Sequence, residues 1–383
     1  MNRSSLLMTA ATASAFALTP ASAATLPTAD GPVPVGNWGY QLQGSAAQGG
    51  ELLPGPLAAA PHDLLVVDYA RFGDEGSLFT NEEVSAINNR AGAGGDRRVS
   101  SAYVSIGEAS EFRSYWDPAW TSNGKADGAL TAAAPSWLGP VNPDWPESRK
   151  VRYWDPDWQE ILFNDADTGY VDTIVGQGFD SAYLDIVDAY FFWGEEVRDR
   201  DKKPGDPTDV QDAARRMIDF VVELTADARQ ANDDFFVIPQ NGAFILNDSD
   251  FAGPLAADPA RRAAYLDAAG GIAVEDVYFG GDADEDNAFD PDEDTVGVLQ
   301  RDFLAAGLPV FAVDYLTNPE KVERFEQRAI ADGFLPYVAN SRDLDTLSAP
   351  STPTAVPEPV AASALGLLGA LLLRRRPHGT LSA

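Results

Sequence analysis

Short apolar runs alternate with longer amphipathic stretches between residues 36 and 340. The apolar runs are rich in β-branched and aromatic residues and are bounded by turn residues, as buried strands are. They occupy residues 37–44, 63–70, 99–109, 179–189, 235–242, 271–280, 309–316 and 333–340. The pattern therefore predicts eight buried strands.

The segments between these runs carry helical patterns. Residues 209–230 place Ala213, Met217, Phe220, Val221 and Leu224 on one apolar stripe, as a helix packed on a core requires. NEEVSAINNR follows the second run with Asn81 as its candidate cap. DPDWQEILFNDADTGYVDTIVGQG precedes the fourth run, begins with an aspartate before Pro156 and ends at a glycine. DPARRAAYLDAAG, PDEDTVGVLQRDFLAAG and NPEKVERFEQRAIADG continue the alternation.

Strands that alternate with helices predict an α/β fold, here a single-domain (β/α)8 TIM barrel over residues 24–340. A doubly wound nucleotide-binding sheet is the alternative, but AGAGGD (91–96) follows a helix instead of opening one. Residues 110–155 are too long and too rich in Pro, Gly and Trp for a simple connection. We expect them to form an inserted loop after the third strand, at the rim where barrels bind substrates.

The two ends of the chain read as targeting signals. Residues 1–23 combine an early arginine, an apolar stretch and small residues before the expected cut, which predicts a secretory signal peptide. Residues 341–356 are rich in Ser, Thr and Pro and predict a flexible linker. Residues 357–376, with PEP, a 14-residue apolar run and three arginines, resemble the PEP-CTERM sorting signal, and 377–383 form a tail. A plain hydrophobic anchor is the alternative.

That resemblance implies processing by an exosortase-type enzyme as a partner. The protein would then be exported to the cell surface or the extracellular space. Contact with the membrane would be transient, through the signal peptide and the C-terminal segment.

Composition removes several classes of chemistry. The chain has no cysteine and only two histidines, His62 and His378, which excludes thiolate chemistry and a multi-histidine metal site. A formal charge of −32 argues against nucleic acid as a partner. We expect no cofactor and no metal. Calcium-loop spacing in DADEDNAFDPDE (282–293) lacks the glycine at its sixth position, so a solvated acidic loop is the preferred interpretation.

Nearly every predicted strand ends in a polar or acidic residue. These residues are Gln41, Asp68, Glu108, Asp185, Asp188, Asn241, Glu275, Asp276 and Asp314. Because the carboxyl ends of barrel strands meet at one rim, this pattern predicts a functional cleft there. On a continuing strand Asp185 and Asp188 cannot both point inward, so one of them is a structural partner.

Carboxylates without histidine, cysteine or a phosphate-binding loop indicate cleavage of glycosidic bonds, which needs one protonated and one ionised carboxyl group. Aromatic side chains that stack on sugars are expected beside them. The candidates are Trp38, Tyr40, Tyr69, Trp116, Trp137, Trp145 and Tyr315. The rival interpretation is a carbohydrate-binding matrix protein without turnover.

Seven stretches occur in the order of one known family. They are WGYQLQG, LLVVDYARFG, AYVSIGEASEFRSYW, GFDSAYLDIVDAY, IPQNG, VEDVYFG and VFAVDY. Over residues 36–340 the chain resembles the endo-α-1,4-polygalactosaminidases of glycoside hydrolase family 114.

The resemblance implies a retaining hydrolase acting on α-linked, galactosamine-containing polysaccharide, with Asp185 as nucleophile and Glu275 as acid/base. It also implies a set of residues that bind the sugar or tune the pair: Asp68, Glu108, Arg113, Asp188, Asn241 and Asp314. The strand-end residue Gln41 and the aromatic residues Tyr40, Tyr69 and Tyr315 complete the predicted binding set. Asp314 departs from the glutamate expected there. An enzyme acting on neutral α-glycans is a further alternative.

Overall fold

Eight parallel strands form the centre of the protein in the computed structural model, which describes residues 24–90 and 97–351. Five are hydrogen-bonded in the order β10-β9-β5-β4-β3 and three in the order β11-β12-β13. Their bounds are β3 Trp38–Gln41, β4 Leu64–Asp68, β5 Val99–Ser105, β9 Ser181–Asp185, β10 Phe236–Pro239, β11 Ile272–Glu275, β12 Val310–Tyr315 and β13 Leu335–Ala339. Each predicted apolar run contains one of these strands, so the strand prediction is confirmed.

The two groups of strands adjoin at both edges in the order expected for a barrel. Two isolated parallel bridges, Val237 with Ala269 and Gln240 with Ala273, connect β10 to the β11 segment. Side chains connect β13 to β3, where the Trp38 indole donates to the Leu335 carbonyl at 2.9 Å. No backbone ladder joins β13 to β3 within the described residues, so the continuous closed barrel of the prediction is seen only in part.

Alternate side chains of the strands face an inner core. Leu64, Val66, Tyr183, Phe311 and Tyr337 are among its buried residues, and their spacing follows the two-residue repeat of a strand. A short antiparallel hairpin, β1 (Ala24–Leu26) with β2 (Val33–Val35), adds apolar side chains to the same core. The opposite faces of the strands pack against helices in a second, larger core.

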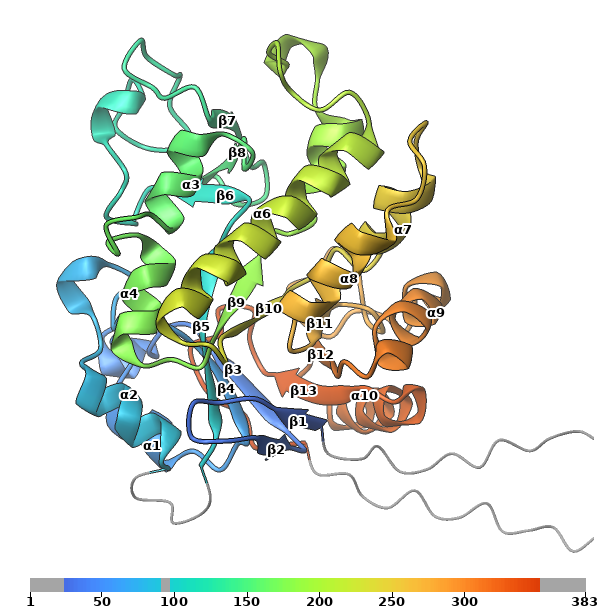
Figure 1. Ribbon diagram of the computed structural model, residues 1–383. Coiled ribbons are helices and arrows are strands. Elements are labelled where there is room, and N and C mark those ends of the chain that lie inside the picture. Colours follow the sequence, from blue (N-terminus) through green and yellow to red (C-terminus); the bar gives the residue numbers. More distant parts are fainter. Residues whose placement is uncertain (1–23, 91–96, 352–383) are drawn as a thin grey trace, which may run out of the picture. The chain divides into compact units, whose positions relative to one another are not determined.

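Helices lie around the outside of the strands (Figure 1). They are α1 Pro54–Ala59, α2 Asn81–Asn88, α3 Pro156–Leu162, α4 Tyr170–Gln177, α5 Ala189–Phe191, α6 Val210–Ala231, α7 Ile245–Phe251, α8 Pro259–Ala268, α9 Glu293–Asp302 and α10 Pro319–Asp332. The predicted apolar stripe of α6 is buried, as expected. No helix in the described part of the chain has the length and hydropathy to cross a membrane.

Two helix predictions need correction. Thr80, and not Asn81, caps α2, because its hydroxyl accepts a hydrogen bond from the Glu83 amide in a capping box. The single helix expected over residues 155–178 is two helices, α3 and α4. Asn164 begins the break between them, where its side chain accepts hydrogen bonds from the Ala166 and Thr168 amides and so stabilises a turn.

The insert after β5 is a small subdomain and not only a loop. It contains an antiparallel sheet of β6 (Glu108–Ser110), β8 (Ser148–Val151) and β7 (Leu138–Val141) in that order. Its interior is aromatic, with Trp120 5.3 Å from Trp116 and 5.2 Å from Trp137 between ring centroids. This packing holds the insert together.

Residues 341–351 differ from the flexible linker expected at residues 341–356. They lie against the barrel: Leu344 is 6% exposed, and its carbonyl accepts a hydrogen bond from the Leu42 amide at 2.9 Å. The expected signal peptide 1–23, residues 352–356, the expected sorting segment 357–376 and the tail 377–383 lie outside the described residues.

Candidate active site

Asp185 and Glu275 end two strands on either side of β10 and line the same pocket. This pocket, which we name the rim pocket, has a volume of about 400 Å³. It receives side chains from the strand ends, from the insert and from residues 341–344. The strand-end pattern of the sequence therefore brings these two carboxyl groups to one cavity.

Both oxygens of Asp185 accept hydrogen bonds. The Tyr103 hydroxyl donates to Oδ2 at 2.5 Å, and the Ile186 amide donates to Oδ1 at 2.8 Å. Burial and the neighbouring Glu275 carboxyl raise the pKa of Asp185 to about 7, against the opposing effect of the Tyr103 hydrogen bond. Asp185 therefore changes its charge near neutral pH.

Glu275 is held by two neighbours from adjacent strand ends. Asn241 donates from Nδ2 to Oε1 at 3.1 Å, and the Tyr315 hydroxyl donates to Oε2 at 2.8 Å. The Glu275 amide donates in return to Asn241 Oδ1 at 3.3 Å. Asn241 adopts a left-handed backbone conformation with φ of 61°, which asparagine tolerates better than most residues.

Asp188 lines the rim pocket together with Asp185, contrary to the expectation that only one of them faces inward. The strand ends at Asp185, and Ile186 has φ of 61°, so the period of two no longer applies beyond it. Asp188 stays solvent-accessible within the cleft. The cleft walls raise the pKa of Asp188 to about 6 by desolvation, opposed by the positive charge of Lys150.

The insert supplies one side of the rim pocket. Glu108 lies at the start of β6, since the third barrel strand ends earlier, at Ser105. Its carboxylate pairs with the Lys150 ammonium at 2.5 Å and accepts a hydrogen bond from Asn142 at 2.8 Å. Lys150 therefore places a positive charge among the carboxyl groups of the cleft.

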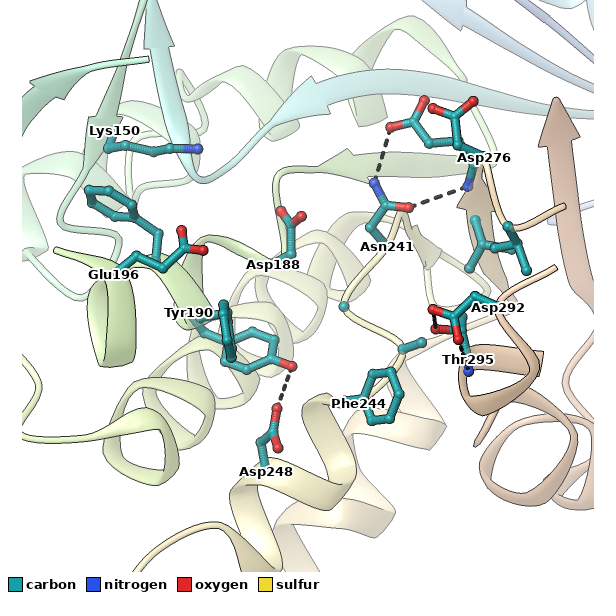
Figure 2. Close-up of a pocket in the computed structure, with 17 residues that line it drawn as sticks. Lys150, Asp188, Tyr190, Glu196, Asn241, Phe244, Asp248, Asp276, Asp292 and Thr295 are labelled. Carbon is teal, nitrogen blue, oxygen red and sulfur yellow. Dashed lines mark hydrogen bonds between the residues drawn. The ribbon is translucent and has the colours of Figure 1, made fainter. Parts of the chain in front are cut away.

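A second pocket of about 660 Å³ shares a wall with the rim pocket. We name it the side pocket (Figure 2). The residues common to both are Lys150, Asp188, Asn241 and Glu275. The side pocket is also lined by Glu196, Asp248, Asp276 and Asp292 and by Tyr190, Phe191, Phe192 and Phe244. The side chains of Asp188 and Glu275 thus border both pockets.

Few of the candidate stacking aromatics reach the rim pocket. Tyr40, Trp145 and Tyr315 line it, whereas Trp38, Tyr69, Trp116 and Trp137 are buried in the hydrophobic cores. Phe112 also lines it, and it is 53% exposed, compared with 50% for Trp145. Two large exposed aromatic side chains on a polar cleft are suited to stacking on sugar rings.

Five residues of the predicted binding set line neither pocket: Gln41, Asp68, Tyr69, Arg113 and Asp314. Gln41 donates to the Asp345 carbonyl at 3.0 Å. Asp68 and Arg113 form a buried ion pair at 2.8 Å. Tyr69 packs on Tyr170 at 4.3 Å between ring centroids. These contacts engage the side chains within the protein.

Asp314 points to the outer face of β12, because its neighbours Val313 and Tyr315 face the inner core. Its Oδ1 accepts from the Phe279 amide at 3.2 Å, while Oδ2 is buried without a hydrogen-bond partner among the described residues. Burial and the nearby Asp276 carboxyl raise the pKa of Asp314 to about 8.

Tyr103, Asn142, Lys150 and Arg342 also line the rim pocket, although none of them was a candidate from the sequence. Tyr103 was detectable, because it shares the parity of Ser105 on β5 and lies opposite Tyr183 of β9. The other three come from the insert and from the segment after β13, whose positions no strand pattern predicts.

The described residues contain no group of three or more His, Cys, Asp or Glu side chains placed to hold a metal ion. In the acidic loop, Asp286 accepts hydrogen bonds from the Thr317 and Asn318 amides, and Asp292 caps α9. Asp286, which belongs to the calcium-like spacing, and Asp292 of the same loop therefore have structural roles.

A family model described as glycoside-hydrolase family GH114 matches residues 19–352. Uncharacterized proteins of Methanocaldococcus jannaschii and Deinococcus radiodurans are each 32% identical to this chain over 320 residues. The alignments cover 81% of this chain and 78% of the first relative, and 82% of both chains for the second. A third uncharacterized relative, from Thermotoga maritima, is 30% identical over 321 residues, or 81% of this chain and 82% of its own length.

Among solved structures, the glycoside hydrolase domain of PelA from Pseudomonas aeruginosa has a similar fold. The TM-score is 0.53 at 18% identity, and the match covers 82% of this chain and 97% of that domain. This likeness concerns the fold, an α/β arrangement of the glycoside hydrolase type.

The buried carboxyl group of Asp314 predicts a pH-dependent effect on stability. Between about pH 4 and pH 8 Asp314 keeps a proton in the folded protein that it has lost in the unfolded chain, so its contribution to stability falls as pH rises, by about 1 kcal/mol per pH unit. Asp314→Asn cannot ionise. We expect its melting temperature, measured relative to wild type by calorimetry, to rise steadily from pH 5 to pH 8.

The matched control is Asp199→Asn, at a fully exposed side chain, which should show no such trend. A difference between Asp314→Asn and wild type that stays constant across this pH range would contradict the assignment of a protonated Asp314.

Proposed function

This chain belongs to glycoside-hydrolase family GH114, and we propose that it hydrolyses α-glycosidic bonds in an extracellular polysaccharide that contains galactosamine. The observation that carries the proposal is the pair of carboxyl groups, Asp185 and Glu275, in one pocket. Each accepts two hydrogen bonds from its surroundings, which keeps it in a fixed orientation.

We assign a retaining mechanism to this pair. The Asp185 carboxylate attacks the anomeric carbon while the Glu275 carboxyl group gives its proton to the departing glycosidic oxygen. Glu275 then removes a proton from water, which attacks the same carbon and releases Asp185. Tyr103 and Tyr315 orient the two carboxyl groups through their hydroxyls.

The proposed substrate follows from the lining of the two pockets. The carboxylates of the side pocket outnumber its one cation, Lys150, which favours a sugar with a protonated amine. Trp145 and Phe112 of the rim pocket and Phe191 of the side pocket offer exposed apolar faces for sugar rings. Because these platforms lie in two pockets that share Asp188 and Glu275, we propose that the chain cuts within a polysaccharide strand.

Export is a further part of the proposal. The signal peptide at residues 1–23 and the sorting segment at residues 357–376 would take the barrel to the cell surface, where an exosortase-type enzyme would process the tail. An extracellular polysaccharide is the substrate that such a location offers.

The first test is release of reducing ends from de-N-acetylated galactosaminogalactan by wild type, Asp185→Asn and Glu275→Gln. We expect cleavage by wild type and a loss of about 100-fold or more in both variants, because each removes one half of the acid–nucleophile pair. Asp314→Asn serves as a control that changes a carboxyl group outside both pockets.

If wild type binds the polysaccharide without cleaving it, the protein is a carbohydrate-binding matrix protein and the hydrolase proposal fails. Cleavage of neutral α-glycans but not of the galactosamine polymer would agree with the proposed hydrolysis and contradict the proposed substrate.

The charge of Asp185 predicts the pH dependence of the reaction. The reaction needs one ionised and one protonated carboxyl group, and a pKa of about 7 for Asp185 beside Glu275 means that the pair loses its last proton near neutral pH. We expect kcat/KM to fall as pH rises through about 7, because this proton is lost, and Asp188→Asn to retain this fall. A kcat/KM that stays constant from about pH 6 to pH 9 would contradict a proton shared by Asp185 and Glu275.

A further inference from the structure

The segment after β13 lies over the seam between the last and the first strand of the barrel. We name residues 341–348 the strap. Its Asp345 carbonyl accepts from Gln41 at 3.0 Å, and the Ser348 amide donates to the Tyr337 hydroxyl at 3.2 Å. That same hydroxyl donates to the Tyr40 carbonyl at 3.2 Å. The strap is therefore attached to both strands where their backbones do not pair.

The strap places one cation in the cleft wall. Arg342 lines the rim pocket, and its Nη2 lies 3.0 Å from each carboxylate oxygen of Asp276. Its guanidinium carbon is 3.9 Å from the centre of the Tyr315 ring, at the distance of a cation–π contact. The side chain of Arg342 is 22% exposed, so solvent screens these contacts only in part.

Asp276 and Tyr315, two of the partners of Arg342, are both adjacent to Glu275. Tyr315 donates its hydroxyl to Glu275 Oε2 at 2.8 Å. Asp276 is the next residue in the chain after Glu275, and it has a left-handed backbone with φ of 57°. Aspartate tolerates this backbone conformation better than most residues, and the contact with Arg342 holds its side chain.

The rim pocket has few cationic side chains, so the contacts of Arg342 matter for the charge around Glu275. Lys150 and Arg342 are the two cationic residues that line it, and Lys150 pairs with Glu108 of the insert. Arg342 is therefore the cation on the Glu275 side of the pocket. The Arg342 guanidinium covers one face of the Tyr315 ring, so a sugar ring cannot stack on that face.

We propose that Arg342 is a positioning residue of the active site, which holds Tyr315 and Asp276 so that the Glu275 carboxyl group stays aimed into the rim pocket. The strap is then a part of the catalytic apparatus, contributed by chain beyond the eight strands. Its effect on turnover rests on the proposed hydrolase function, whereas its effect on Tyr315 does not.

The test compares wild type with Arg342→Ala by crystallography and by kinetics. We expect the Tyr315 hydroxyl to leave Glu275 in the variant. We also expect kcat to fall about 10- to 100-fold with a smaller change in KM, because misplacement of a reacting group acts on the chemical step. Added guanidinium chloride at a non-denaturing concentration should restore part of kcat to Arg342→Ala but none to Glu275→Gln.

Arg324→Ala is the matched control, since the Arg324 guanidinium stacks on Phe289 at 3.6 Å and lines neither pocket. It should leave kcat and Tyr315 unchanged. Arg342→Lys keeps the charge but not the planar group that stacks on Tyr315, so we expect only partial activity.

A Tyr315 hydroxyl that stays on Glu275 in Arg342→Ala overturns the inference whether or not the protein is active. A displaced Tyr315 with unchanged kcat also overturns it. A wild type that cleaves no glycan overturns the proposed function. The position of Tyr315 in the Arg342→Ala structure then decides alone whether Arg342 is a positioning residue.

Discussion

Two carboxyl groups that share a pocket repel each other once both are ionised, and the surrounding strands must hold them in place against that repulsion. Asp185 and Glu275 achieve this with hydrogen bonds from Tyr103, the Ile186 amide, Asn241 and Tyr315. Burial and repulsion from Glu275 raise the pKa of Asp185 more than its hydrogen bonds lower it. The same conflict makes such a pair chemically useful, because it separates the protonation states of two otherwise similar groups.

Parts of the chain outside the eight strands complete this arrangement. The insert contributes Lys150 on one side, and the strap contributes Arg342 on the other. Each of these cations is paired with its own carboxylate, Glu108 or Asp276, so neither is left unpaired in the cleft. The central strands therefore position the reacting groups, while the added segments set the charge and shape around them.

The periodicity of the sequence predicted most of the strands and the location of the pocket. The eight apolar runs identified the strands, and the acids at their ends located the pocket, because parallel strands bring their carboxyl ends together. The predictions were weakest where neighbouring residues were both assigned to the site. Asp314 and Tyr315 lie on opposite faces of β12, as the period of two requires, and only Tyr315 reaches the pocket.

Other features had no periodic signal. The left-handed Ile186 turns Asp188 into the cleft, and a turn of this kind at a β-branched residue is not expected from sequence. The strap looked like a linker because its composition is polar, yet Leu344 and the hydrogen bond from Gln41 fix it to the barrel. Covalent trapping tests the central assignment most directly: the protein is incubated with a 5-fluoro galactosaminyl fluoride, digested and mapped by mass spectrometry. The retaining mechanism predicts one sugar adduct, on Asp185. An adduct on Glu275, or the absence of any adduct on a protein that cleaves the polysaccharide, would contradict the assignment of Asp185 as nucleophile and Glu275 as acid/base.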